Sequence, residues 1–256
     1  MTESGSTEIP ILDWRRFLSD RDRFVSELGA AARDTGFFVL SHHGVPSTLL
    51  ADAFAAGDEF FALPFEEKDA VAIHRSGGTN RGYAGQGTEA LDETSGVKDR
   101  KEAFNVGLDL AADDPRMGEP FRAANLWPSL DGFRDTMLAY YTSVLELSVA
   151  LHGAVALDLG LPQHHFDGSF DAPMATLRLL HYPAGDTASS IGAGAHTDYG
   201  ALPLLMTDGV GGLQVRARGS NAWTDVPHVA GEPRYPAVLA SDYLASRLAA
   251  TYETQS

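Results

Sequence analysis

Hydrophobic residues recur at helical spacing in several stretches of the chain. Between residues 21 and 34 the apolar positions Phe24, Leu28 and Ala31 lie four and three residues apart, so they share one face of a helix. The same spacing predicts three more helices, over residues 47–62, 129–159 and 240–252. Pro64 ends the first of these three, and Gly160 ends the second.

Short apolar runs bounded by glycine and proline predict strands elsewhere. In the first half of the chain these runs are residues 9–14, 37–40 and 102–107. After Pro173 they are residues 176–182, one or two strands within 194–205, and a hairpin that joins 212–216 to 223–226. Closely spaced short strands are typical of a sandwich or barrel rather than of a parallel sheet. Helices and strands together predict an α+β protein.

In residues 75–96 the apolar residues follow neither the helical period of 3.6 nor the strand period of 2. It is rich in glycine, serine and threonine, and we interpret it as a long loop. Loops of this length inside a compact domain are more often functional covers than idle connections. We therefore expect residues 75–96 to cover a substrate site.

Composition narrows the classes of partner. The chain has 256 residues, with 35 acidic and 19 basic side chains and a formal net charge of −16. Such a surface repels phosphate backbones and anionic lipid headgroups, so we expect neither nucleic acid nor membrane as a partner. The N-terminus lacks the features of a signal peptide, which makes a cytoplasmic protein the expectation.

The chain contains no cysteine, so any metal must be held by histidine and carboxylate. His196-Thr-Asp198 is the first candidate, because side chains at i and i+2 of a strand lie on the same face. A histidine and a carboxylate are two-thirds of the facial triad that binds Fe(II). A second pair with this spacing, His165-Phe-Asp167, follows Pro162 and is best interpreted as a solvated turn.

The residues around His196 carry a more specific signal than the pair itself. Residues 192–205, followed by 209–215, resemble the metal-site segment of the Fe(II)/2-oxoglutarate-dependent dioxygenases of the isopenicillin N synthase type. The upstream segment 177–183 resembles the strand that precedes the site in that family. Further matching segments follow in the family's order, at residues 9–13, 36–45, 60–64, 81–83 and 101–104. The resemblance runs from residue 9 to about residue 226.

This resemblance implies a double-stranded β-helix, or jelly-roll barrel, with flanking helices. It implies Fe(II) as the metal, 2-oxoglutarate as co-substrate and O2 as oxidant. His196 and Asp198 would be the first two iron ligands, and Tyr182 would offer its hydroxyl to the co-substrate carboxylate. Arg178, by contrast, is interpreted as a structural ion-pair partner, and His181 as a structural histidine on the opposite strand face. The implied reaction is hydroxylation, desaturation or cyclisation of a small organic molecule.

After Val226 the chain departs from the family pattern. A distal iron-binding histidine and an Arg-x-Ser that binds the far carboxylate of 2-oxoglutarate are expected there. Instead Arg234-Tyr-Pro resembles the family's extreme C-terminal region, which indicates an internal deletion of barrel strands. A rival alignment takes His228 as the distal iron ligand and Arg234 as the co-substrate clamp.

These observations predict three regions. They are an N-terminal dioxygenase-type region over 1–115, a helical region over 116–172, and a truncated jelly-roll region with a C-terminal helix over 173–256. We expect a monomer, or weak association through the exposed edges of the barrel. A second functional hypothesis stays open: a catalytically impaired relative that lacks the third iron ligand and serves as a binding or interaction protein, or a degenerate gene product.

Overall fold

The computed structural model describes residues 8–88, 101–183, 195–198, 200–217 and 219–227, together with the backbone of 237–240. The chain forms two compact units. The described parts of residues 1–47, 144–170 and 197–256 form the first unit, and those of 48–143 and 171–196 form the second unit. Mixed helices and sheets are present, as predicted, and the described strands do not close into a barrel.

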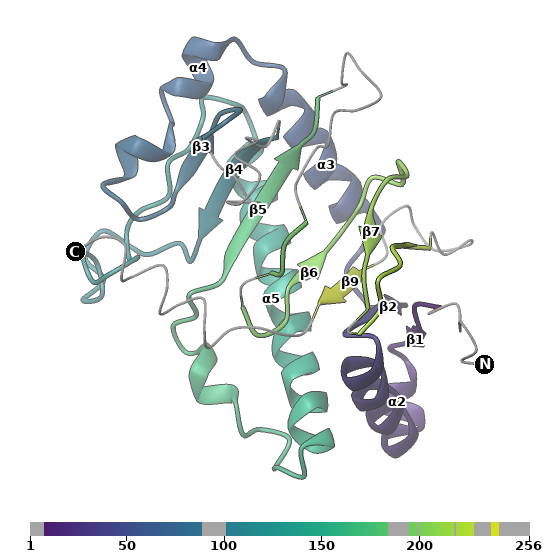
Figure 1. Ribbon diagram of the computed structural model, residues 1–256. Coiled ribbons are helices and arrows are strands. Elements are labelled where there is room, and N and C mark those ends of the chain that lie inside the picture. Colours follow the sequence, from purple (N-terminus) through teal and green to yellow (C-terminus); the bar gives the residue numbers. More distant parts are fainter. Residues whose placement is uncertain are drawn as a thin grey trace. The chain divides into compact units, whose positions relative to one another are not determined.

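A four-stranded sheet in the order β1-β2-β9-β6 is the centre of the first unit (Figure 1). Its strands are β1 (Ile11–Asp13), β2 (Phe37–Ser41), β9 (Ala237–Ala240) and β6 (Leu204–Leu205). β1 pairs with β2 in parallel, whereas β9 is antiparallel to both of its neighbours. A separate antiparallel hairpin joins β7 (Gln214–Val215) to β8 (Thr224–Asp225).

Helices complete the first unit. α1 (Arg16–Ser19) leads into α2 (Arg21–Asp34), and the 3-10 helix η2 (Asp167–Phe170) follows α5 (Phe133–Asp158), whose second half belongs here. α2 ends in an ion pair, 2.6 Å long, between Arg33 Nη1 and Asp158 Oδ2. The Asp158 carboxylate occupies the space that a Cβ at Gly29 would need, so a larger residue there would require this carboxylate to move.

The second unit is built on the antiparallel sheet β3-β4-β5. Its strands are β3 (Gly82–Ala84), β4 (Glu102–Gly107) and β5 (Thr176–His181), and its other elements are α3 (Ser47–Phe61), α4 (Phe65–Asp69), the 3-10 helix η1 (Ile73–Ser76) and the first half of α5. The ring of Phe104 lies 4.6 Å from that of Phe60 and 5.3 Å from that of Phe133, centroid to centroid. These aromatic contacts fasten α3 and α5 to the central strand.

The helix predictions are largely confirmed. α2, α3 and α5 occupy the stretches 21–34, 47–62 and 129–159, with α5 beginning four residues late at Phe133. Pro64 does end α3, but it also precedes a short helix that periodicity missed. Proline is well suited to the first turn of a helix, because its missing N–H has no helical partner there, and α4 starts directly after Pro64.

The interpretation of residues 75–96 as one long loop was wrong for its described part. Residues 73–76 form η1, and residues 82–84 form β3 with all three residues buried. β3 pairs with β4 over only three residues, too short a run for any period to be read from the sequence. The rest of the expected cover, residues 89–96, lies outside the described residues.

Two predictions near the C-terminus were wrong in their boundaries. Of the one or two strands expected within 194–205, the described residues of that range contain only β6, which has two residues. Ala240 is the last residue of β9 and not the start of a helix, because β9 pairs with β2 over four residues. Residues 241–252 lie outside the described part. Pairing with strands far apart in sequence overrides local helical periodicity at residue 240.

None of the described helices combines the length and the hydropathy that a bilayer span requires.

Candidate metal and co-substrate site

His196 and Asp198 lie on an irregular segment ahead of β6. Both side chains are exposed, and the described residues between 195 and 203 include no strand. The expectation that a strand aims both side chains to one face is therefore wrong. The loop conformation of this segment sets their directions.

A third metal ligand is not seen in the part of the chain that the structure describes. There, no three histidine, aspartate or glutamate side chains gather closely enough to hold a metal ion. His228 and Arg234, the residues of the rival alignment, lie outside the described residues. In the second pair, His165 and Asp167, the aspartate has another partner. Asp167 accepts a 2.9 Å hydrogen bond from the ring of the exposed His164.

Tyr182 directly follows β5 and is 47% exposed. Alternation along the strand places Leu179 and His181 on one face, and Arg178 and Tyr182 on the other. Leu179 lies against α3, 3.8 Å from the position of a Cβ at Gly57. The face with Tyr182 is therefore the one turned away from α3.

The α3-side face of the same sheet carries a buried polar network around Glu102. The Lys68 ammonium donates to Glu102 Oε2 at 2.7 Å, and the Tyr83 hydroxyl donates to the same oxygen at 2.6 Å. His181 Nδ1 lies 3.4 Å from the other oxygen, Oε1. We call these four residues the Glu102 network. Sequence reasoning missed it, because no spacing rule links residues 68, 83, 102 and 181; the only available signal was a charged residue within a predicted apolar strand.

Burial and hydrogen bonding set the protonation of this network. Burial raises the pKa of Glu102, but the hydrogen bonds from Lys68 and Tyr83 outweigh it and hold the pKa below its usual value. Burial, together with the neighbouring Glu102 carboxylate, raises the pKa of Tyr83 well above its usual value. At neutral pH the carboxylate is therefore ionised and the phenol is protonated, as the two short hydrogen bonds require.

Described residues also line two cavities. One, of about 400 Å³, belongs to the second unit and is lined by residues 77–79 and 118–122. The other, of about 220 Å³, belongs to the first unit and lies beside the β7–β8 hairpin. Neither cavity is lined by His196, Asp198 or Tyr182. Beside the larger one, the buried Arg81 guanidinium donates to the carbonyls of Thr79, Asn80 and Phe121, which ties two loops together.

Comparison with known proteins decides the family. Residues 9–130 match the family described as the non-haem dioxygenase in morphine synthesis N-terminal region, and residues 173–235 match the 2OG-Fe(II) oxygenase superfamily. The chain is 34% identical over 239 residues to the 2-oxoglutarate-Fe(II) type oxidoreductase hxnY of Emericella nidulans, covering 88% of this chain and 68% of that protein. The chain belongs to the 2OG-Fe(II) oxygenase superfamily. The 2-oxoglutarate-dependent dioxygenase citB of Monascus ruber is also 34% identical, over 89% of this chain and 73% of its own length.

Solved structures of this superfamily share the fold. The full-length T7H of Neurospora crassa in complex with alpha-KG superposes with a TM-score of 0.79 at 29% identity, over 96% of this chain and 76% of T7H. A 2OG-Fe(II) oxygenase family protein from Caulobacter crescentus superposes with a TM-score of 0.77 at 29% identity, over 91% of this chain and 74% of its own.

The resemblance stated from the sequence is thus confirmed at the level of the superfamily. This oxygenase is an Fe(II)/2-oxoglutarate-dependent dioxygenase, and its cofactors are Fe(II), 2-oxoglutarate and O2.

Proposed function

We propose that this oxygenase oxidises a small organic molecule and that His196 and Asp198 are two of its Fe(II) ligands. An imidazole nitrogen and a carboxylate oxygen are donors that suit Fe(II). Both side chains are exposed, so an ion can reach them from solvent. When bound, Fe(II) supplies the activation of O2 that is coupled to the decarboxylation of 2-oxoglutarate.

One observation carries this assignment. The His-x-Asp pair lies within residues 173–235, the segment that matches the oxygenase superfamily, immediately ahead of β6. The other pair with the same spacing, at 165 and 167, lies outside that segment, and its aspartate is bonded to His164. Position in the matched segment therefore favours the pair at 196 and 198.

The third ligand and the co-substrate clamp have two open assignments. His228 and Arg234 both fall within the matched segment, which supports His228 as the distal ligand and Arg234 as the partner of the far carboxylate of 2-oxoglutarate. A guanidinium would bind that carboxylate through two charge-assisted hydrogen bonds. The alternative is an internal deletion that removed both groups, which would leave a catalytically impaired relative that serves as a binding protein.

Tyr182 is the proposed residue of this chain that touches the co-substrate. Its side chain leaves β5 on the face opposite α3, together with Arg178, and is nearly half exposed. A phenol in that place can donate a hydrogen bond to a carboxylate of 2-oxoglutarate. Its part in the reaction is to orient the co-substrate.

The proposed architecture is a jelly roll that lacks part of its strands, within the three regions 1–115, 116–172 and 173–256. The two-residue strands β6, β7 and β8 support this, because intact barrels pair longer strands. The proposed state is a monomer, or weak association through exposed strand edges, which can pair with another chain.

Solved relatives support a small organic substrate. Neurospora crassa T7H has been crystallised with alpha-KG and thymine, and JOX2 with 2OG, Fe and JA. A rice relative is a dioxygenase for auxin oxidation. We propose that this oxygenase also acts on a small molecule and on neither nucleic acid nor membrane, in keeping with its net charge of −16.

Anaerobic Fe(II) titration of single variants tests the ligand assignment. His196→Ala and Asp198→Ala should each weaken Fe(II) binding at least tenfold, whereas the matched control His165→Ala should leave it unchanged. His228→Ala decides between the two assignments of the third ligand: weakened binding supports a complete triad, and unchanged binding supports the deletion. Equal Fe(II) affinity in wild type and His196→Ala would contradict the proposed site.

A further inference from the structure

Glu102 is the point at which three elements of the second unit meet. Lys68 belongs to α4, Tyr83 to β3 and His181 to β5, and all three side chains converge on the carboxylate of Glu102 in β4. Lys68 Nζ also donates to the carbonyl of Phe61 at 3.1 Å, at the end of α3. A single carboxylate therefore links α4, β3 and β5, and through Lys68 reaches α3.

The geometry holds His181 from two sides. Glu102 and His181 are direct partners in the β4–β5 register, so their side chains leave the sheet on the same face. Across that face the His181 ring stacks on Phe61, with centroids 5.1 Å apart and planes 25° from parallel. The phenyl ring stacks on the imidazole, and the carboxylate lies 3.4 Å from its Nδ1 without forming a hydrogen bond, so both border the side chain of the last residue of β5.

Fixing His181 also fixes the residue that follows it. Tyr182 is joined to His181 by one peptide bond, and its side chain leaves on the opposite face. The backbone at residue 181 therefore helps to set the position from which the Tyr182 side chain starts. No other residue of β5 lies closer in the chain to Tyr182.

Burying the charged groups of the Glu102 network costs free energy, which a purely structural contact could avoid by using apolar side chains. The side chains of Lys68 and Glu102 are 10% and 8% exposed, so the ion pair is almost fully desolvated. Buried ion pairs of this kind add little net stability over well-packed apolar side chains, but they hold a defined geometry. A role of this ion pair in holding a defined geometry agrees with its place beside the end of β5, where Tyr182 is to be oriented.

We infer that Glu102 is a positioning residue for 2-oxoglutarate: it holds His181, and through the end of β5 it holds Tyr182. This inference rests on the proposed role of Tyr182. Glu102 itself does not touch the co-substrate. Its effect is carried by the backbone, in the way that outer hydrogen-bond partners orient the groups that bind a ligand directly.

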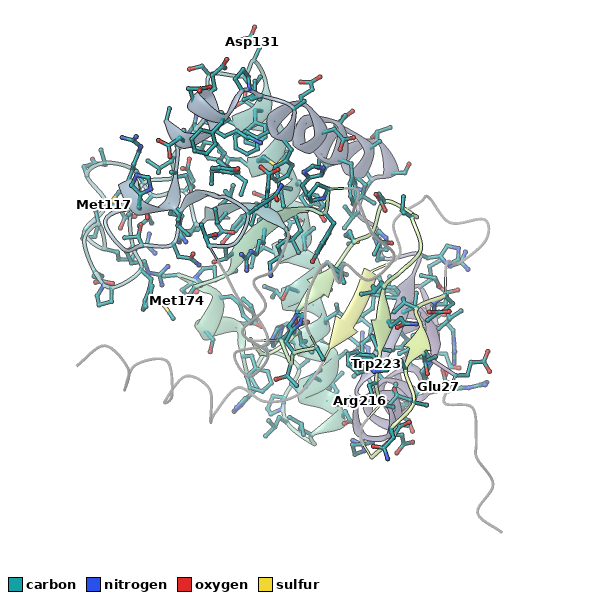
Figure 2. The ribbon with its side chains drawn as sticks, turned by 45° about the horizontal axis from the view of Figure 1, so that its top comes forward. Glu27, Met117, Asp131, Met174, Arg216 and Trp223 are labelled. Carbon is teal, nitrogen blue, oxygen red and sulfur yellow. The ribbon has the colours of Figure 1, made fainter. Side chains whose placement is uncertain are left out.

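The first test measures 2-oxoglutarate affinity in the Fe(II)-loaded full chain. Glu102→Gln keeps the shape of the side chain but removes its charge. The KM for 2-oxoglutarate should rise roughly tenfold, as for other outer-partner losses, while kcat changes less than about twofold. Glu27→Gln is the matched control, because Glu27 (Figure 2) also accepts hydrogen bonds from two side chains, Arg16 and Arg23, but in the first unit. It should leave both constants unchanged.

A double-mutant cycle separates positioning from a general loss of structure. If Glu102 acts through Tyr182, then Glu102→Gln should weaken 2-oxoglutarate binding in the wild-type background but add nothing to Tyr182→Phe. An equal loss in both backgrounds would overturn the inference.

Amide hydrogen exchange of the metal-free chain gives a readout that is independent of activity. Residues 179–183 should exchange faster in Glu102→Gln than in wild type, and also in His181→Gln, which keeps Glu102 and its ion pair and serves if Glu102→Gln fails to fold. Unchanged exchange at these residues in a folded variant would overturn the inference.

Binding of 2-oxoglutarate to wild type and to Glu102→Gln separates the proposed function from the positioning role. A wild-type chain that binds no 2-oxoglutarate in the presence of Fe(II) would refute the proposed function and this inference together. A wild-type chain that binds 2-oxoglutarate, with a Glu102→Gln variant that binds it equally well, would refute only the positioning role.

Discussion

The sheet β3-β4-β5 and the segment 195–227 differ sharply in how they are supported. All six residues of β4 are buried, and its aromatic and polar side chains are tied to surrounding helices. In the described part of 195–227 only Val215 and Ala217 are buried, and each strand has two residues. The better-built region carries the proposed positioning network, whereas the poorly covered segment carries the candidate iron ligands.

This difference shows that superfamily membership and a preorganised site are separate properties. The match to the superfamily extends over both regions. A metal site, however, needs ligands that are held rigidly by their surroundings. The segment 195–227 would gain that support from the core strands that the sequence pattern lacks after Val226.

The largest effect should come from breaking the aromatic core of the sheet. Phe104 is fully buried between Phe60 and Phe133, so Phe104→Ala should lower the free energy of unfolding by about 3–5 kcal/mol. Denaturant unfolding measures this loss. A loss below about 1 kcal/mol would mean that the sheet is not the more stable region.

Removing the cation of the Glu102 network should be nearly as damaging. Lys68→Met leaves Glu102 buried with Tyr83 as its remaining close donor, which should cost about 3 kcal/mol. The matched control, Arg16→Gln, breaks a more exposed pair with Glu27 and should cost less than about 1 kcal/mol. Equal unfolding free energies for the two variants would contradict the distinction between buried and exposed pairs.

A pH-dependent effect is expected from His152 in the first unit. Burial lowers its pKa, against a smaller opposing effect of its 2.7 Å hydrogen bond with the Ser148 carbonyl, and its ring packs edge-on against Phe170. The folded state therefore favours the neutral form of the His152 imidazole. Its contribution to stability is present above the ordinary histidine pKa of about 6.5 and is lost as the pH falls through the lower folded value.

Thermal unfolding between about pH 7 and pH 5 checks this sign. His152→Leu should flatten the fall in melting temperature, and the exposed His165→Leu should not. A wild-type melting temperature that rises on acidification would contradict the assignment.

The smallest effect should come from the hairpin β7–β8. Trp223 is 47% exposed, and the Arg216 guanidinium lies 5.2 Å from the centroid of its ring (Figure 2). Trp223→Ala should therefore cost less than about 1 kcal/mol in unfolding free energy. A cost comparable to that of Phe104→Ala would show that the hairpin is as firmly packed as the sheet.

Sequence patterns predicted the parts of the fold that depend on local periodicity. α2, α3 and α5 carry long apolar stripes, so their positions could be read directly. β3 and β9 could not be predicted, because each is a short strand that exists only through pairing with strands distant in sequence. His196, Asp198 and Tyr182 were selected by motif, but the irregular backbone at 195–203 is set by tertiary context. The Glu102 network joins residues up to 113 positions apart, taking residue 68 with 181, and no linear pattern encodes it.

The most direct test of the account is an anaerobic titration of the wild-type chain with Fe(II) and then 2-oxoglutarate. Chelation of iron by the 2-oxo acid produces a metal-to-ligand charge-transfer band, which neither component shows alone. We predict that the band appears at saturable 2-oxoglutarate concentrations, is lost in His196→Ala and persists in His165→Ala. No band in the wild type, or an undiminished band in His196→Ala, would contradict a functional iron site at His196 and Asp198.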